Sequence, residues 1–239
     1  YFRKEIKDLR KESENKLIDY LGWHKQNEDY FFVGLPLLSG RLSGKKKSLI
    51  RDLVEENDLN LRLTPNQDIL LCNIPNKNKS KIKKALKKIG YDNLNDINEI
   101  QRHALACPAL PLCGLAMTEA ERILPEVLTR IENLLTDMNI EKTILFRMTG
   151  CPNGCTRPYM AELALVGSGQ NKYQLWLGGS KNLQRLAKPY LQRMELDDLE
   201  KTIQPLLKFW KKSSAEKDFG DFINNQKESF ITKLLSEIN

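Results

Sequence analysis

The stretch that decides the fold reads Met-Thr-Gly-Cys-Pro-Asn-Gly-Cys-Thr-Arg-Pro-Tyr-Met-Ala-Glu-Leu, residues 148–163. Cys151 and Cys155 stand in it with three residues between them, Pro-Asn-Gly, which form turns readily and expose backbone N–H groups. Such donors stabilise negative charge on thiolate sulfur and favour a redox centre, although the same residues also suit a plain turn after a strand. A β-rich run at 142–149 precedes the turn and an apolar run at 163–167 follows it. The stretch therefore predicts a loop between two strands.

A second pair of cysteines, Cys107 and Cys113, is separated by five residues and lies in a segment rich in Pro and Gly. Two pairs on separate loops can supply four thiolates to one site. Structural zinc also takes four thiolates, but its paired ligands usually have about two to four residues between them. A cubane iron–sulfur cluster is larger and tolerates wider spacing. The spacing favours a 4Fe-4S cluster, with zinc and unrelated structural cysteines as the alternatives.

Composition sets the broad class of the protein. A chain of 239 residues is expected to form two modest domains, and its 41% hydrophobic residues are enough for their cores. Five cysteines are an odd number in a chain too long to need disulfides for stability, which favours metal binding. No apolar run reaches the roughly 18 residues of a membrane helix. We expect no membrane partner and a cytoplasmic or stroma-like reducing compartment.

The net charge of +7 is concentrated at residues 41–51 and 77–88, and the second run holds seven lysines without one acidic residue. Nucleic acid is one interpretation of such runs. Against it, Lys, Asn and Ile are abundant together, which is typical of genes with few G and C bases. A solvated lysine face is favoured over a patch that docks a partner, and no nucleic-acid partner is expected.

The pattern of elements predicts three segments: a charged connection at 1–29, an α+β unit at 30–95 and a second α+β domain at 96–239. A strand from Tyr30, a helix at 48–57, strands at 59–63 and 67–74 and a helix at 79–89 form the first unit. Cys72 lies in the strand expected at 67–74 and is expected to fill the core and not to bind a metal. In the second domain, Thr118 and Glu121 have the spacing of a capping box, which predicts a helix from there to about 137, kinked at Pro125. A hairpin over 163–177 and helices at 197–212 and 222–238 complete the chain.

Two motifs carry a resemblance to a known family. Residues 106–122, Ala-Cys-Pro-Ala-Leu-Pro-Leu-Cys-Gly-Leu-Ala-Met-Thr-Glu-Ala-Glu-Arg, and residues 148–163 resemble the cofactor motifs of the assimilatory sulfite and nitrite reductases. The likeness is to the C-terminal half of that family, and the continuation at 157–159 is most similar to its ferredoxin-dependent sulfite branch. It covers residues from about 30 to 222, with the first unit similar to a ferredoxin-like half-domain and the remainder to a sirohaem and 4Fe-4S domain. Residues 1–29 match poorly.

The resemblance implies a set of cofactors, residues and partners. Cys107, Cys113, Cys151 and Cys155 would converge on one 4Fe-4S cluster, and Cys155 would bridge it to the iron of sirohaem. Asn153 and Arg157 are candidates to bind the carboxylates of sirohaem. The implied activity is the six-electron reduction of sulfite to sulfide with electrons from ferredoxin. His24 and His103, the other possible haem ligands, are expected to have ordinary structural roles.

The resemblance also implies what the chain lacks. The family's sulfite-binding Arg and Lys residues belong to an N-terminal half, so that half is an expected partner and this chain alone is expected to be inactive. Two alternatives remain at this point: the same half of a ferredoxin-dependent nitrite reductase, and a non-catalytic module that binds zinc or a cluster.

Overall fold

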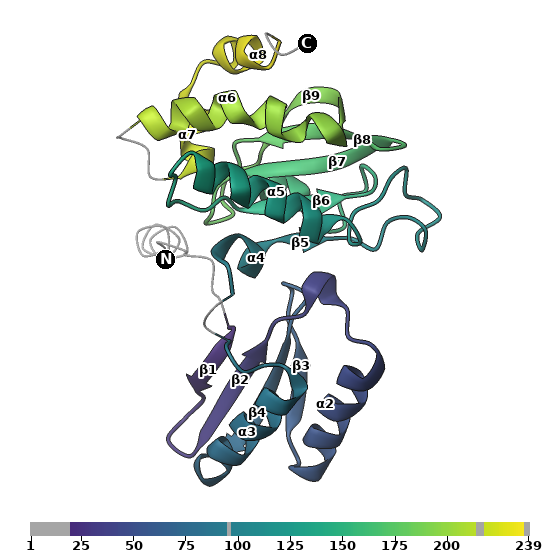
Figure 1. Ribbon diagram of the computed structural model, residues 1–239, viewed down its shortest axis with the longest axis vertical. Coiled ribbons are helices and arrows are strands. Elements are labelled where there is room, and N and C mark those ends of the chain that lie inside the picture. The colour runs from purple at the N-terminus through teal and green to yellow at the C-terminus, as the bar shows by residue number, and fades with distance from the viewer. Residues whose placement is uncertain (1–19, 95–96, 214–217, 237–239) are drawn as a thin grey trace, which may run out of the picture.

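The computed structural model describes residues 20–94, 97–213 and 218–236 of the chain. Its strands form two separate sheets, and each sheet belongs to its own unit, the N-terminal one at the bottom of Figure 1 and the C-terminal one above it. Within these ranges no helix combines the length and the apolar character needed to cross a membrane.

The first unit is an antiparallel sheet with helices packed on it, as expected for a ferredoxin-like half-domain. Its strands lie in the order β1-β2-β4-β3. Their bounds are β1 (Gly22–Lys25), β2 (Tyr30–Leu35), β3 (Asn60–Leu63) and β4 (Ile69–Pro75). The helical elements are η1 (Leu38–Gly40), α2 (Gly44–Glu56), η2 (Asn76–Asn78) and α3 (Lys79–Ile89). In α3 the apolar residues recur every three or four positions, so Ile82 and Leu86 enter the core while the lysines between them stay exposed.

The second unit is built on a five-stranded mixed sheet in the order β5-β6-β7-β8-β9. Its strands are β5 (Leu105–Ala106), β6 (Phe146–Thr149), β7 (Leu163–Gly169), β8 (Lys172–Leu177) and β9 (Lys188–Glu195). Its helical elements are α4 (Glu99–His103), α5 (Leu124–Asp137), η3 (Pro158–Met160), η4 (Leu196–Asp198), α6 (Leu199–Lys212), α7 (Phe219–Asn225) and α8 (Glu228–Ser236). β5, β6 and β7 are parallel, and β8 and β9 continue the sheet antiparallel.

The direction of the strands positions the two cysteine loops. β5 and β6 are adjacent parallel strands, and the loops carrying Cys107 and Cys151 leave from their C-terminal ends. Both loops therefore emerge at the same edge of the sheet. Along β6 the side chains alternate, because successive residues of a strand point to opposite faces. Phe146 and Met148 enter the large core shared with α5 and α6, whereas Arg147 points to the opposite face.

The structure corrects the predicted connection at 1–29, because residues 22–25 of it form strand β1, hydrogen-bonded to β2. A four-residue strand with two polar residues shows too little alternation to be found from sequence, and pairing with β2 determines it instead. The remainder of that segment to residue 19, and the predicted boundary at 95–96, lie outside the described residues.

The predicted capping box at Thr118 and Glu121 is wrong. Thr118 is buried, and its hydroxyl donates to the Tyr173 hydroxyl at 3.1 Å. The helix begins later, at Leu124, so Pro125 lies in the first turn, where its missing N–H is not needed and no kink follows. Strand β9 was not predicted, and the helix expected at 222–238 is two helices, α7 and α8.

Candidate functional site: two interlocked cysteine loops

The loop that holds Cys151 and Cys155 is closed at its base by side chains on either side of it. The hydroxyl of Thr149 donates to the Cys151 carbonyl at 3.0 Å, and that of Thr156 donates to the Met148 carbonyl at 2.9 Å. Within the loop, the N–H of Arg157 donates to the Gly154 carbonyl at 2.8 Å. These bonds fix the backbone around both cysteines without using their sulfur atoms.

Tyr159 covers this loop from outside. Its hydroxyl donates to the Pro152 carbonyl, and its ring lies over Gly154. A Cβ atom at residue 154 would approach the Tyr159 ring to 2.7 Å, and the backbone there has φ of +66°, so glycine is required on both counts. The Tyr159 ring also packs against Trp176, with 4.6 Å between ring centroids.

The loop that holds Cys107 and Cys113 interlocks with the first loop at Gly150. The N–H of Gly150 donates to the Cys107 sulfur at 3.3 Å, and the Gly150 carbonyl accepts from the N–H of Met117 at 2.8 Å. A Cβ atom at residue 150 would lie 2.6 Å from the Cβ atom of Ala109, so only glycine allows this approach. The N–H of Cys113 donates to the Ala109 carbonyl at 2.8 Å, which folds the second cysteine back toward the first.

The electrostatics of Cys107 reflect both its burial and its neighbours. Burial raises the pKa of the Cys107 thiol, the N–H groups of Gly150 and Ala109 act to lower it, and the nearby thiols of Cys155 and Cys151 raise it further. Three of the four predicted ligands therefore lie near enough to influence one another. Cys113 is half-buried, whereas Cys155 is exposed.

The fifth cysteine, Cys72, is buried in β4 of the first unit. Within the described ranges, no three His, Cys, Asp or Glu side chains are arranged so that they could hold a metal ion. The assignment of Cys107, Cys113, Cys151 and Cys155 as one ligand set stays a prediction. His24 stacks on Phe32 at 4.8 Å, and its Nε2 is 2.9 Å from the Leu21 carbonyl.

The two residues predicted to bind a cofactor through polar groups lie in different settings. Asn153 is exposed at the tip of the loop. Arg157 adopts a left-handed backbone conformation with φ of +56°, and its Nη2 donates to the Pro65 carbonyl at 2.9 Å. Pro65 belongs to the turn between β3 and β4 of the first unit, so the Arg157 side chain joins the two units. Cofactor binding by Asn153 and Arg157 also stays a prediction.

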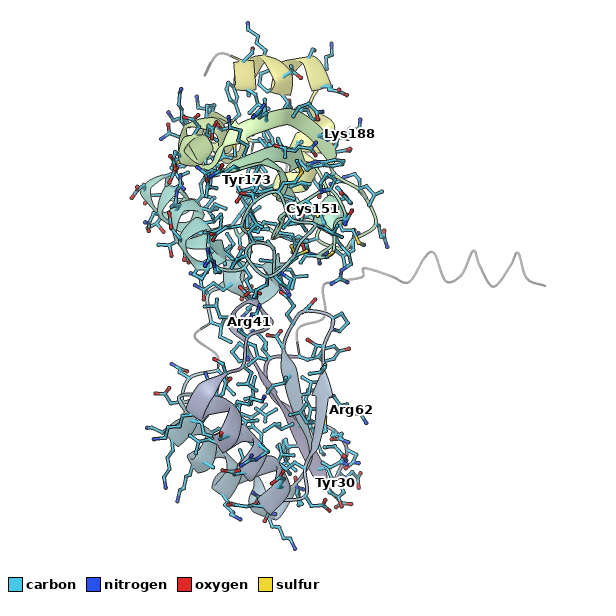
Figure 2. The ribbon with its side chains drawn as sticks, turned by 90° about the vertical axis from the view of Figure 1, so that its right-hand side faces the viewer. Tyr30, Arg41, Arg62, Cys151, Tyr173 and Lys188 are labelled. Atoms are coloured by element: carbon cyan, nitrogen blue, oxygen red, sulfur yellow. The ribbon has the colours of Figure 1, made fainter. Side chains whose placement is uncertain are left out.

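The same turn of the first unit reaches the other cysteine loop. Gln67 donates from Nε2 to the carbonyl of Ala106, the residue before Cys107, at 2.9 Å. A second junction is formed by Arg41, whose guanidinium pairs with the Glu121 carboxylate at 2.6 Å. Figure 2 shows Arg41 where the two units meet, with Cys151 in the upper unit. The first unit therefore supports both loops.

Sequence reasoning missed two buried charged residues beside the loops, Arg147 and Glu162. Arg147 is 1% exposed, and burial together with the neighbouring Arg157 lowers its pKa to about 10. Glu162 is fully buried, and its carboxylate accepts from the N–H groups of Leu145 and Gly220, each at 2.8 Å. Burial raises the pKa of Glu162 to about 7, although Lys181 and both N–H donors act to lower it. A charged residue within an apolar strand-forming run is the signal that could have identified both.

A cavity of about 440 Å³ lies elsewhere along the junction of the units. Its lining includes Lys46, Asp68, Tyr91 and Arg102, and none of the five cysteines contributes to it. It is therefore separate from the cysteine loops.

Comparison with known proteins gives the family context of this site. Residues 24–89 match the family described as nitrite/sulfite reductase ferredoxin-like half domain. The chain is 45% identical over 227 residues to a sulfite reductase (ferredoxin) of Synechococcus elongatus, covering 92% of this chain and 36% of the relative. It is 37% identical over 210 residues to a sulfite reductase (NADPH) hemoprotein beta-component of Methylocella silvestris, covering 85% of this chain and 36% of the relative. The chain thus spans little more than a third of the length of these relatives.

Solved structures show the same fold. The structure of the Mycobacterium tuberculosis NirA protein aligns with a TM-score of 0.73 at 22% identity, over 90% of this chain and 41% of that one. A dissimilatory sulfite reductase I structure aligns with a TM-score of 0.58 at 9% identity, over 87% of this chain and 69% of that one.

Proposed function

Because this chain belongs to the sulfite and nitrite reductase family, we propose that it is the cofactor-binding part of a sulfite reductase that uses ferredoxin as its electron donor. The observation that carries the proposal is the interlocking of the two cysteine loops at Gly150, in a chain 45% identical to a ferredoxin sulfite reductase over 92% of its length. The proposed reaction is the six-electron reduction of sulfite to sulfide, in a reducing compartment such as the cytoplasm or a plastid stroma.

The chemistry of the two loops fits a 4Fe-4S cluster, although their described cysteines are not arranged around a single metal ion. Four cysteines provide soft thiolate ligands, and the N–H groups of Gly150 and Ala109 stabilise negative charge on one of them, Cys107. Cys107, Cys113, Cys151 and Cys155 would hold the cluster, and Cys155, the exposed member of the set, would be shared with the iron of sirohaem. When bound, the two groups would supply electron transfer and the iron at which sulfite is reduced.

The chain's own residues have positioning roles in this proposal. Thr149 and Thr156 fix the base of the loop, and Tyr159 holds its outer side. Asn153 and Arg157 are the proposed donors to the carboxylates of sirohaem. The Nη2 of Arg157 is already bonded to the Pro65 carbonyl, so the remaining N–H groups of its guanidinium would make those contacts.

Ferredoxin is proposed as the donor from the description of the Synechococcus relative and from the charge of this chain. The lysines of α3 lie in the run 77–88, and five of them are exposed, Lys81, Lys83, Lys84, Lys87 and Lys88. Ferredoxins are acidic, so a basic helix can steer them by long-range attraction.

Anaerobic reconstitution tests the cluster. Wild-type chain should take up iron and acid-labile sulfide in a four-to-four ratio, as expected for a cubane. Serine variants of Cys107, Cys113, Cys151 and Cys155 should each lose the cluster, whereas C72S is the matched control and should retain it. Zinc uptake in place of iron, or a cluster that survives all four site substitutions, would contradict the proposal.

A second measurement concerns activity. Sirohaem-treated chain supplied with reduced methyl viologen should produce no sulfide from sulfite, because sulfite is an anion and its reduction needs a cationic pocket with positioned proton donors. The family supplies that pocket from residues outside this chain. Turnover close to that of an intact sulfite reductase would show that those residues are not required.

A further inference from the structure

Arg147 is a buried cation in the strand that leads into the loop of Cys151 and Cys155. It lies in β6 on the face opposite the main core, between Leu105 of β5 and Ala164 of β7. Only 1% of its surface is exposed. The strand that carries it ends two residues later, and the loop with Cys151 begins there.

Its polar contacts leave the charge uncompensated. Nη1 donates to the carbonyl of Arg157 at 3.2 Å, and Nε is buried without an acceptor. Among the described residues no Asp or Glu forms an ion pair with it, and the charged side chain that affects it is a second cation, Arg157. Two half-buried arginines of this chain, by contrast, have a carboxylate partner: Arg130 pairs with Glu200, and Arg185 pairs with Asp221.

A buried guanidinium without an anion is strongly unfavourable, since its lost hydration is not replaced. A water molecule could satisfy Nε, but it carries no charge. The strand of Arg147 leads into the loop of Cys151 and Cys155, and a cluster bound there would supply the anion that no Asp or Glu among the described residues supplies. A cubane held by four thiolates is itself anionic, and one added electron makes it more negative.

We propose that Arg147 is a buried counter-cation of the cluster, which stabilises the reduced state and so raises the cluster's reduction potential. The proposal rests on the proposed function, since it needs a cluster on these loops. Arg147 acts through the field of its charge and through its bond to the Arg157 carbonyl, so it is a positioning residue. If an effective dielectric constant of about 20 and a separation of about 10 Å are assumed, Coulomb's law gives a change in the ratio of reduced to oxidised cluster on the order of tenfold.

The test compares R147M with R147K in the same chain, before and after cluster loading. Methionine removes the charge but fills much of the same space, whereas lysine keeps the charge. In the cluster-loaded R147M chain, the ratio of reduced to oxidised cluster at a fixed solution potential should fall on the order of tenfold. That ratio is followed by the EPR signal of the reduced cluster during titration with dithionite. R147K should stay close to wild type.

Stability gives a second and independent readout. Without the cluster, R147M should unfold at the same or a higher urea concentration than wild type, because an unfavourable buried charge has been removed. Cluster loading should then stabilise wild type more than R147M. A purely structural arginine would give the opposite pattern, with R147M weaker in both states and its reduction potential unchanged.

R193M is the matched control, because Arg193 is an exposed cation of the same sheet. Its reduction potential should equal that of wild type. A cluster that binds to R147M with an unchanged potential overturns the inference alone. A wild-type chain that binds no iron–sulfur cluster overturns the proposed function and the inference together.

Discussion

The stability of this chain is predicted to fall between pH 4.5 and pH 7 because of Glu162. This carboxyl group is fully buried and its pKa in the folded chain is raised from 4.5 to about 7 by burial. Below pH 4.5 the group is neutral in both the folded and unfolded states, so it adds no penalty. As the pH rises, the unfolded chain ionises first, and folding must then keep the group neutral or bury its charge. The penalty is complete above about pH 7.

The magnitude follows from the same values. A rise from 4.5 to about 7 corresponds to about 3 kcal/mol, at about 1.4 kcal/mol for each pH unit. This is a large fraction of the roughly 5–15 kcal/mol by which a domain is stable. The loss of stability should begin locally, at the start of α7. The N–H of Gly220 in α7 donates to Glu162, which directly precedes β7, so this bond connects the two elements.

Urea unfolding from pH 4.5 to 7.5 measures the effect, with E162Q as the test variant. E162Q should be weaker than wild type at pH 4.5, since its amide NH₂ must face one of the two N–H donors, but its stability should change little with pH. E200Q is the control of opposite sign, and its scan continues below pH 4.5: the bond from Arg130 lowers the pKa of Glu200, so the stability that Glu200 contributes is lost only on acidification below pH 4.5. If the free energy of unfolding of wild type and of E162Q changed with pH in parallel, the reasoning would be refuted. The two N–H donors would then lower the pKa of Glu162 as much as burial raises it.

Three further predictions concern the loops, the junction and the basic helix. Y159F, which removes the hydroxyl that holds the cysteine loop, should cost about 1 kcal/mol in urea unfolding and speed iron loss to a chelator, whereas Y190F should not speed it. R41Q, which breaks the half-exposed pair with Glu121, should lower the free energy of unfolding by about 1 kcal/mol or less. If the same decrease were measured in high salt, the pair would make no ionic contribution. Replacing four exposed lysines of α3 with Gln in the full-length enzyme should weaken ferredoxin-linked turnover at low salt. Unchanged turnover would mean that the lysines of α3 form only a solvated face and do not dock ferredoxin.

Local pattern was sufficient for some of the regular elements of this chain. The helix predicted at 79–89 is α3 residue for residue, because its apolar positions repeat with the helical period and Gly90 ends it in a left-handed conformation. The hairpin of β7 and β8 follows from two apolar runs separated by a turn. The predicted α+β class is confirmed, and each of the two units has a sheet of its own.

Tertiary contacts decided the features that local pattern missed. Thr118 has the spacing of a helix cap, but the hydroxyl of Tyr173, 55 residues away in the sequence, determines where it bonds. A charged residue within an apolar run indicates that Arg147 and Glu162 are buried, but their partners lie elsewhere in the fold, so no local window shows which groups they bond to. The cysteine motifs were visible in the sequence because each is compact, whereas the support behind them is assembled from both units.

That support changes how the first unit should be understood. A half-domain joined only by a linker could be removed without disturbing the cysteine loops. Here the β3–β4 turn binds the residue before Cys107 through Gln67 and accepts from Arg157, two residues after Cys155. One rigid turn thus fixes both cysteine loops at once, and their separation depends on it. The first unit is therefore part of the support of the two cysteine loops, and a chain that begins after it should hold the loops less firmly than this one.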